Sequence, residues 1–142
     1  MYPLVYIDKK SHIECRLAIN RVLDGAVSSL LSAYGKYDTR FIVLVYSIKE
    51  YFKEYTELTS YAITLMTLHY LQTIRVLPCL QILSLSKPTV EIVNDKDVYY
   101  EKKLDKVREY MKKTYSTNNS SVGELFIGFF IYYGFTFDVF VI

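Results

Sequence analysis

The chain has 142 residues, a length that excludes two complete domains. Of these residues 51% are hydrophobic and 23% charged, a balance that excludes an intrinsically disordered chain. Its formal net charge is only +2, which excludes a protein that is basic over its whole surface. Any affinity for a polyanion must come from local clusters such as Lys102, Lys103, Lys106, Arg108, Lys112 and Lys113.

Two short runs at the start of the chain have the composition of β-strands. Residues 3–7 and 12–19 are β-branched or alternating, and the polar turn DKKS separates them, so they predict two strands or a hairpin. From Asp24 onward the pattern becomes helical. Asp24 is expected to cap a helix that ends near Tyr34.

The next two helices are expected to bring polar residues to their ends. Asp38 is a candidate cap for the second helix, in which apolar residues recur at helical spacing: Phe41, Val45, Ile48 and Phe52. Lys49 and Lys53 then lie one turn apart on one side of it. Thr59 is a candidate cap for a third helix to about Ile74, with Ser60 and Tyr61 in the first turn, where free N–H groups favour anions.

The second half of the chain is expected to be less regular at first. Residues 76–83 predict a turn and a short apolar run, and residues 86–95 predict a surface loop. An amphipathic helix facing solvent is expected over 97–115. Ser121 and Glu124 form a capping-box pattern that starts a last helix. The expected fold is mostly α, with a small N-terminal β element.

The apolar segment 124–142 has about the length of a membrane span. Glu124 and Asp138 would fall inside such a span, Gly134 interrupts it, and the capping box belongs to an ordinary helix start. A buried helix followed by an apolar strand or loop is therefore expected, with no membrane partner.

Few residues of the chain are suited to bind metal or form disulfides. The only cysteines are Cys15 and Cys79 and the only histidines are His12 and His69, and their spacing matches no zinc motif. The N-terminus lacks the apolar core of a signal peptide. A reducing compartment, cytoplasmic or nuclear, is expected.

Two lysines and a helix N-terminus on neighbouring helices would suit a triphosphate, and the adjacent Tyr61 would stack on a base. The spacing alone is weak evidence, because lysine pairs four apart usually lie on a solvated surface and a tyrosine in a first turn usually belongs to the core.

The order of the sequence blocks is more specific. "LLSAYGKYDTRFIVLVYSIKEYFKEY", "LTSYAITLMTLHYLQTIRVLPCLQ" and "SVGELFIGFFIYYGFTFDVFVI" follow one another in the chain. The sequence resembles, over essentially its whole length, the noncanonical poly(A) RNA polymerases and terminal uridylyltransferases. These are template-independent RNA 3′-end nucleotidyltransferases of the DNA polymerase β-like superfamily.

The resemblance implies a domain division. Residues 1–22 would be the last strands of the catalytic nucleotidyltransferase sheet, and residues 23–142 the helical central domain, with a PAP-associated segment at about 121–142. It also implies ATP or UTP and an RNA 3′ end as substrates, with Mg²⁺ or Mn²⁺ as the metal in the family.

The same resemblance assigns roles to five residues. Lys49 and Lys53 match the lysines that hold the triphosphate, and Ser60 matches a serine that contacts phosphate. Tyr61 matches the tyrosine that stacks on the base, and Ser28 matches a Ser or Thr near the sugar. Asp38 and Arg40 are expected to form a structural pair rather than a catalytic one.

The chain departs from the family pattern at the metal site. Three carboxylates hold the two metal ions in the family; the first two belong upstream of this chain, and Arg16 in "CRLAIN" stands in place of the third. An arginine is a cation at any working pH and cannot bind Mg²⁺. Val27 replaces an asparagine that contacts the ribose. No catalytic or metal-binding residue is expected in this chain.

Three hypotheses follow. The chain is part of an RNA nucleotidyltransferase whose missing strands lie upstream or in a protein partner, with the isolated chain inactive. Alternatively, it is a catalytically dead pseudoenzyme that keeps a nucleotide or RNA surface. In the third hypothesis it is a helical interaction module whose basic helix contacts a partner. The residues do not distinguish ATP from UTP.

Overall fold

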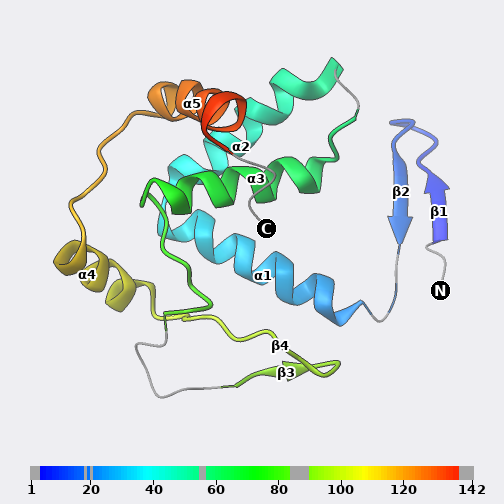
Figure 1. Ribbon diagram of the computed structural model, residues 1–142. Coiled ribbons are helices and arrows are strands. Elements are labelled where there is room, and N and C mark those ends of the chain that lie inside the picture. The colour runs from blue at the N-terminus through cyan, green and yellow to red at the C-terminus, as the bar shows by residue number, and fades with distance from the viewer. Residues whose placement is uncertain (1–3, 18, 20, 55–56, 84–89, 138–142) are drawn as a thin grey trace.

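The computed structural model describes residues 4–17, 19, 21–54, 57–83 and 90–137, and it is mostly helical with two small antiparallel hairpins (Figure 1). The elements in chain order are β1 (Leu4–Ile7), β2 (Glu14–Leu17), α1 (Val22–Tyr37), α2 (Thr39–Tyr51), the 3₁₀ turn η1 (Phe52–Glu54), α3 (Ser60–Thr73), β3 (Ile92–Val93), β4 (Lys96–Asp97), α4 (Leu104–Thr114), α5 (Val122–Ile131) and the π-helical turn η2 (Tyr132–Thr136). The expected fold class, mostly α with a small N-terminal β element, is confirmed.

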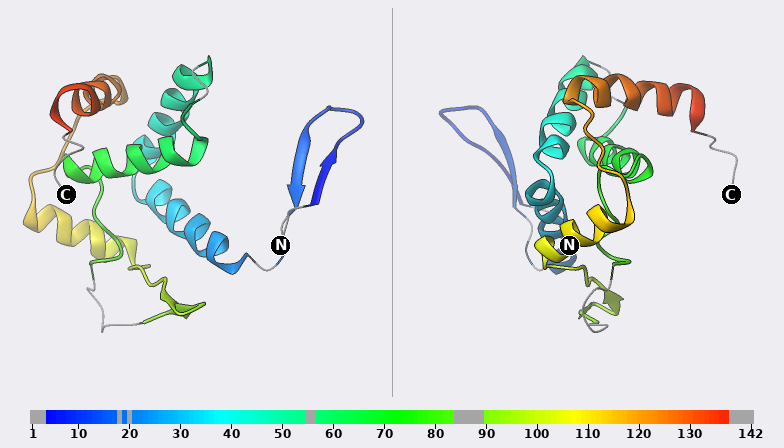
Figure 2. Two further views of the ribbon diagram at one scale, coloured as in Figure 1. Left: turned by 45° about the vertical axis from the view of Figure 1, so that its right-hand side comes forward. Right: turned by 90° about the vertical axis from the view of Figure 1, so that its left-hand side faces the viewer.

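The N-terminal hairpin lies apart from the helices (Figures 1 and 2). β1 pairs with β2 from Leu4 opposite Leu17 to Ile7 opposite Glu14. The Asp8 carboxylate closes the turn by accepting hydrogen bonds from the Ser11 backbone N–H (2.8 Å) and hydroxyl (2.6 Å). All four β1 side chains are exposed. Because two strands alone are marginally stable in water, the apolar faces of this hairpin are suited to further packing.

The first helix starts earlier than the sequence predicts. α1 begins at Val22 with Arg21 at the N-cap, so the prediction that Asp24 caps the helix is wrong. Asp24 instead lies in the first turn, where its carboxylate forms an ion pair with Arg21 (2.7 Å). The negative charge also interacts favourably with the positive end of the helix dipole. α1 also continues to Tyr37, beyond the expected end at Tyr34.

The other predicted caps are confirmed. Asp38 accepts the Arg40 backbone N–H (2.9 Å) at the start of α2, and Thr59 accepts the Ala62 N–H (3.1 Å) at the start of α3. Ser121 and Glu124 form the complete capping box of α5. These side chains satisfy backbone donors that the helix itself leaves without partners.

The hydrophobic core lies where α2, α3 and α5 pack together (Figure 2). Its least exposed side chains include Leu44 and Ile48 of α2, Leu71 of α3, and Leu125 and Phe129 of α5. The buried residues of each helix recur three or four positions apart, so each helix buries one face.

Tyr34 connects α1 to the loop after α3. Its hydroxyl donates to Gln81 (2.9 Å) and accepts hydrogen bonds from the Gln72 side chain (2.9 Å) and the Leu80 backbone N–H (3.1 Å). The side chain is fully buried. Burial raises the pKa of Tyr34 to about 12, so the phenol keeps its proton and remains a donor.

Residues 90–115 differ from the expectation of a loop followed by a long helix. β3 and β4 form a second hairpin whose turn residues, Asn94 and Asp95, have positive φ angles of 49° and 59°. Asp97 accepts backbone N–H groups of Glu91 (3.2 Å) and Tyr99 (2.9 Å), which keeps the chain extended there. α4 therefore begins only at Leu104.

The apolar C-terminal segment is divided between α5 and η2 as far as residue 137, and the predicted strand or loop at 138–142 lies outside the described residues. Over the part of the chain that the structure describes, no helix combines the length and apolar character that a membrane span needs.

Candidate functional site

Two of the five predicted site residues line the same hollow. Ser28 of α1 and Tyr61 of α3 lie on the wall of a cavity of about 380 Å³, together with Val27 and Leu31 of α1. The Tyr61 side chain is half exposed, at 52%. Its ring is therefore accessible to a ligand instead of filling the core, which was the alternative interpretation from the sequence.

The three predicted phosphate contacts do not line this hollow. Ser60 is the first residue of α3 and is exposed, next to Tyr61. Lys49 lies half-buried in the last turn of α2. Lys53 belongs to η1, because α2 ends at Tyr51. The prediction that both lysines lie on the second helix is therefore right for Lys49 and wrong for Lys53.

Lys53 already has an acidic neighbour. Its ammonium group contacts Glu50 at 3.1 Å, and both side chains are largely exposed. An exposed pair of this kind is worth less than about 1 kcal/mol and can exchange for another anion.

One charged pair at the hollow was not predicted from the sequence. Arg21 and Asp24 line it and are joined at 2.7 Å. Their spacing of three residues at a helix start is a recognisable signal for such a pair. The pair sets a cation and an anion beside Ser28, so the hollow has no strong net charge of its own.

The residues present do not fit a divalent metal. Arg16, which the resemblance places where the family has its third carboxylate, lies on β2 with an exposed side chain that contacts Glu14 at 2.7 Å. Over residues 4–137, leaving aside the undescribed positions, no group of three His, Cys, Asp or Glu side chains is arranged to hold a metal ion. A guanidinium offers no lone pair to Mg²⁺ or Mn²⁺.

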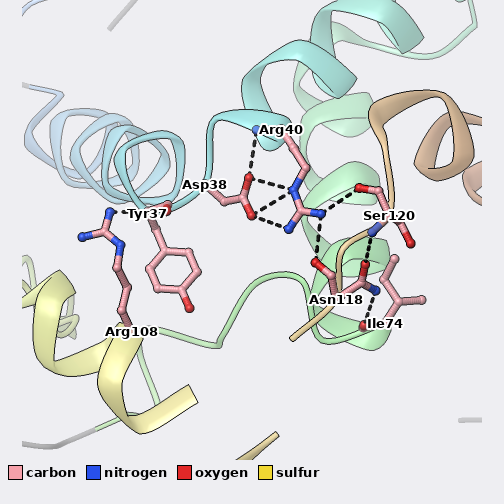
Figure 3. Close-up of polar contacts among 7 residues, drawn as sticks. All are labelled: Tyr37, Asp38, Arg40, Ile74, Arg108, Asn118 and Ser120. Carbon is pink, nitrogen blue, oxygen red and sulfur yellow. Dashed lines mark hydrogen bonds and ion pairs between the residues drawn. The ribbon is translucent and has the colours of Figure 1, made fainter. Parts of the chain in front are cut away.

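Asp38 and Arg40 form the structural pair that the sequence predicts (Figure 3). The closest approach of guanidinium to carboxylate is 2.7 Å. The Arg40 side chain also donates to the backbone carbonyls of Asn118 (3.1 Å) and Ser120 (2.8 Å), just before α5. The Asp38 hydrogen bonds raise the pKa of Arg40 further, so this cation is permanent.

Comparison with known proteins identifies relatives along nearly the whole chain, although no protein-family model matches it. Terminal uridylyltransferase 7 of Homo sapiens is 31% identical over 96% of this chain and 10% of that protein. Poly(A) RNA polymerase GLD2 of Homo sapiens is 30% identical over 96% of this chain and 29% of that protein. Terminal uridylyltransferase cid1 of Schizosaccharomyces pombe is 32% identical over 88% of this chain and 31% of that protein.

The chain thus spans less than a third of the curated relatives it matches. Relatives of both kinds, the poly(A) RNA polymerases and the terminal uridylyltransferases, match the same nearly complete stretch of this chain. By sequence the chain is thus related, over nearly its whole length, to one segment of the noncanonical poly(A) RNA polymerases and terminal uridylyltransferases.

Proposed function

We propose that this chain is the helical, nucleotide-binding part of a template-independent RNA 3′-end nucleotidyltransferase that uses ATP or UTP. The observation that carries the proposal is the sequence relationship to RNA-tailing enzymes over 96% of the chain. The meeting of Ser28 and Tyr61 in one hollow supports it, because the resemblance assigns these two residues to the sugar and the base of one nucleotide.

The geometry suggests how a nucleotide would lie. The base stacks on the accessible ring of Tyr61, and the sugar lies toward Ser28 across the hollow. The phosphates extend past the start of α3, where Ser60 and the free N–H groups of the first turn favour anions. Lys49 and Lys53 neutralise the phosphate charge, and Lys53 gives up its exposed contact with Glu50 to do so.

The catalytic carboxylates come from outside the described residues in this proposal. When bound, Mg²⁺ or Mn²⁺ would activate the RNA 3′-hydroxyl and stabilise the leaving pyrophosphate. The exposed apolar side chains of β1 and β2 support pairing of this hairpin with further strands, either upstream in a longer chain or in a protein partner. The isolated chain binds nucleotide without turnover.

The proposal is tested by nucleotide binding. With Mg²⁺ present and nucleotide at millimolar concentration, calorimetric titration of the folded chain is expected to detect ATP or UTP. Tyr61→Ala is expected to weaken binding by roughly tenfold, because base stacking is worth about 1–3 kcal/mol. Lys49→Ala is expected to weaken it through loss of a phosphate contact.

Tyr46→Ala is the matched control, since Tyr46 is an exposed tyrosine (70%) on α2 that does not line the hollow. Equal effects of Tyr46→Ala and Tyr61→Ala, or no binding by a folded sample, would contradict the nucleotide site. RNA tailing by the purified chain that depends on Lys49 would contradict its predicted inactivity.

Val27 gives a test in the opposite direction. Its side chain lines the hollow beside Ser28, at the position where the family has a ribose-contacting asparagine. Val27→Asn is expected to strengthen nucleotide binding severalfold, since one net hydrogen bond contributes about 1 kcal/mol. The measurement is the ratio of ATP affinity to 2′,3′-dideoxy-ATP affinity. This ratio must rise in the variant if the new amide reaches the sugar hydroxyls, and an unchanged ratio would place the sugar elsewhere.

A second candidate function is a catalytically inactive nucleotide-binding protein. It is favoured by Arg16, which contacts Glu14 and cannot serve as a metal ligand. The mass and activity of the native protein from its source cells separate the two candidates. A longer product with tailing activity supports the enzyme, and a product of about this size without tailing activity supports the inactive protein.

A further inference from the structure

The basic residues of the chain are concentrated around α4. One shallow hollow of about 580 Å³ lies at the start of this helix and is lined by Lys36, Lys103, Lys106 and Arg108 among others. A second hollow, of about 120 Å³, lies near its end and is lined by Arg108, Lys112 and Arg75 among others. Arg108 lines both hollows, so these six residues form a continuous surface, here called the α4 strip.

The charge of the two hollows together contrasts with that of the whole chain. The two hollows are lined by eight of the seventeen basic side chains and by only two of the fifteen acidic ones, Asp38 and Asp105. Their net charge is therefore +6 in a chain of net charge +2, which leaves the rest of the chain negative. Such an asymmetry concentrates the positive potential on one surface.

The cations of the strip differ in what already binds them. Arg108 contacts Asp105 at 2.9 Å and donates to the backbone carbonyls of Lys36 (2.8 Å) and Tyr37 (3.3 Å), which fixes it between α4 and the end of α1 (Figure 3). Within the described residues, no ion pair involves the other five members of the strip, which are exposed: Lys36, Arg75, Lys103, Lys106 and Lys112. Their charges remain available to an external anion.

Arg75 is held in a backbone conformation that favours glycine. It follows α3 with a φ of 59°, and the Val76 and Arg75 N–H groups bond to Leu71 (2.9 Å) and Gln72 (3.1 Å) in a Schellman arrangement. An arginine is less favourable than glycine in this conformation. Its guanidinium lies over the Tyr115 ring, 4.7 Å from the centroid. A strained residue with an exposed cation and an aromatic neighbour points to a binding role.

We propose that the α4 strip binds single-stranded RNA, with phosphates along Lys103, Lys106 and Lys112 and a base stacking at Arg75 and Tyr115. The choice of RNA over another polyanion rests on the proposed function, while the aromatic residues at the end of the strip favour a ligand that has bases. An acidic peptide would need only the charges.

The strip lies at the opposite end of α3 from the nucleotide hollow. Tyr61 is in the first turn of this 14-residue helix and Arg75 is just beyond its end, which separates them by about 20 Å. RNA on the strip is thus bound at a second place, where it can hold the body of the substrate without occupying the nucleotide hollow.

The test is the anisotropy of fluorescein-labelled oligouridylate and oligoadenylate of equal length, titrated with the purified chain at several salt concentrations. Arg75→Gly is expected to weaken RNA binding about fivefold or more and to reduce the slope of log Kd against log salt by about 0.7. The melting temperature is not expected to fall, because glycine relaxes the positive φ. A purely structural arginine would instead lower it.

Lys112→Ala and Lys113→Ala form the matched pair on α4. Lys112 lines the second hollow, whereas its neighbour Lys113 contacts Glu109 at 2.7 Å and lines neither hollow. Only Lys112→Ala is expected to weaken RNA binding. Equal effects of the two, unchanged RNA affinity in Arg75→Gly, or no RNA binding by the unaltered chain at low salt would overturn the proposal. Competition by polyglutamate as effective as by RNA would also overturn it.

Nucleotide affinity measured on the same variants separates this proposal from the previous one. The strip variants are expected to keep the ATP or UTP affinity of the unaltered chain, and Tyr61→Ala is expected to keep its RNA affinity. RNA binding without nucleotide binding would contradict the nucleotide site alone. Nucleotide binding without RNA binding would contradict the strip alone.

Discussion

Gly128→Ala is expected to lower the free energy of unfolding by about 2 kcal/mol, although alanine is the better helix former. Gly128 lies in α5, where a Cβ atom would overlap the Tyr70 hydroxyl of α3 and meet its ring carbon Cζ at 3.3 Å. The Tyr70 side chain is only 4% exposed and packs edge-to-face on Phe129 at 5.9 Å. Because the ring is enclosed, it cannot move aside without disturbing the core.

The effect is measured by urea unfolding followed by far-UV circular dichroism, since the chain has no tryptophan. Tyr70→Phe removes the overlapping hydroxyl, so Gly128→Ala is expected to cost at least about 1 kcal/mol less in that background. Gly25→Ala in α1 is the control, because a Cβ there has no neighbour within 4 Å. It is expected to stabilise by about 0.5–1 kcal/mol. A stabilising Gly128→Ala in the unaltered background would show that the two helices lie farther apart.

The parts of the fold that were predicted correctly depend on local chemistry. Asp38, Thr59 and Ser121 each cap a helix by bonding to a backbone N–H two or three residues ahead, and a side chain can do so whatever the rest of the fold is. The prediction for Asp24 was wrong because the N-cap lies three residues earlier, at Arg21, and the Asp24 carboxylate forms an ion pair with Arg21 instead of capping the helix.

The start of α4 could not be inferred from helical periodicity. Asp97 was expected to start the amphipathic helix, but it pairs with Ile92 of β3, next to the pair of Lys96 and Val93. Such pairing depends on a turn with two positive φ angles at Asn94 and Asp95. Asparagine and aspartate tolerate this conformation, but they also occur in ordinary loops, so the sequence signal for a hairpin was weak.

The candidate sites depend even more on packing between helices. Ser28 and Tyr61 are far apart in the sequence, and only the approach of α1 and α3 brings them to one hollow. The sequence shows the basic cluster in residues 102–113, but it does not show that Arg75, from the end of α3, joins this cluster. Spacing within one helix fixes which residues share a face, while contacts between helices require the fold.

Arg40→Met is expected to lower the free energy of unfolding by about 2–3 kcal/mol. The substitution removes both the cation beside Asp38 and the donors to the Asn118 and Ser120 carbonyls (Figure 3). The Asp38 side chain is only 17% exposed, so water solvates its carboxylate poorly once the Arg40 cation is removed. The cap of α2 is not lost, because Asp38 bonds to the backbone N–H of residue 40, which methionine also has.

Arg21→Met is the matched control for Arg40→Met. Arg21 also pairs with an aspartate at a helix start, at the same 2.7 Å, but its side chain is 62% exposed and that of Asp24 is 56% exposed. Its loss is expected to cost less than about 0.5 kcal/mol. Equal costs for the two variants in urea unfolding would contradict a structural role for the Arg40 network.

Amide hydrogen exchange tests where the Arg40 network acts. Arg40 is the link between the start of α2 and the segment that leads into α5, where Asn118 in turn donates to the Ile74 carbonyl (3.3 Å) and accepts the Ser120 N–H (2.9 Å). Arg40→Met is therefore expected to speed exchange over residues 118–121 more than in the N-terminal hairpin. Arg40→Lys keeps the charge but loses the forked geometry, so its effect is expected to fall between those of Met and the native arginine.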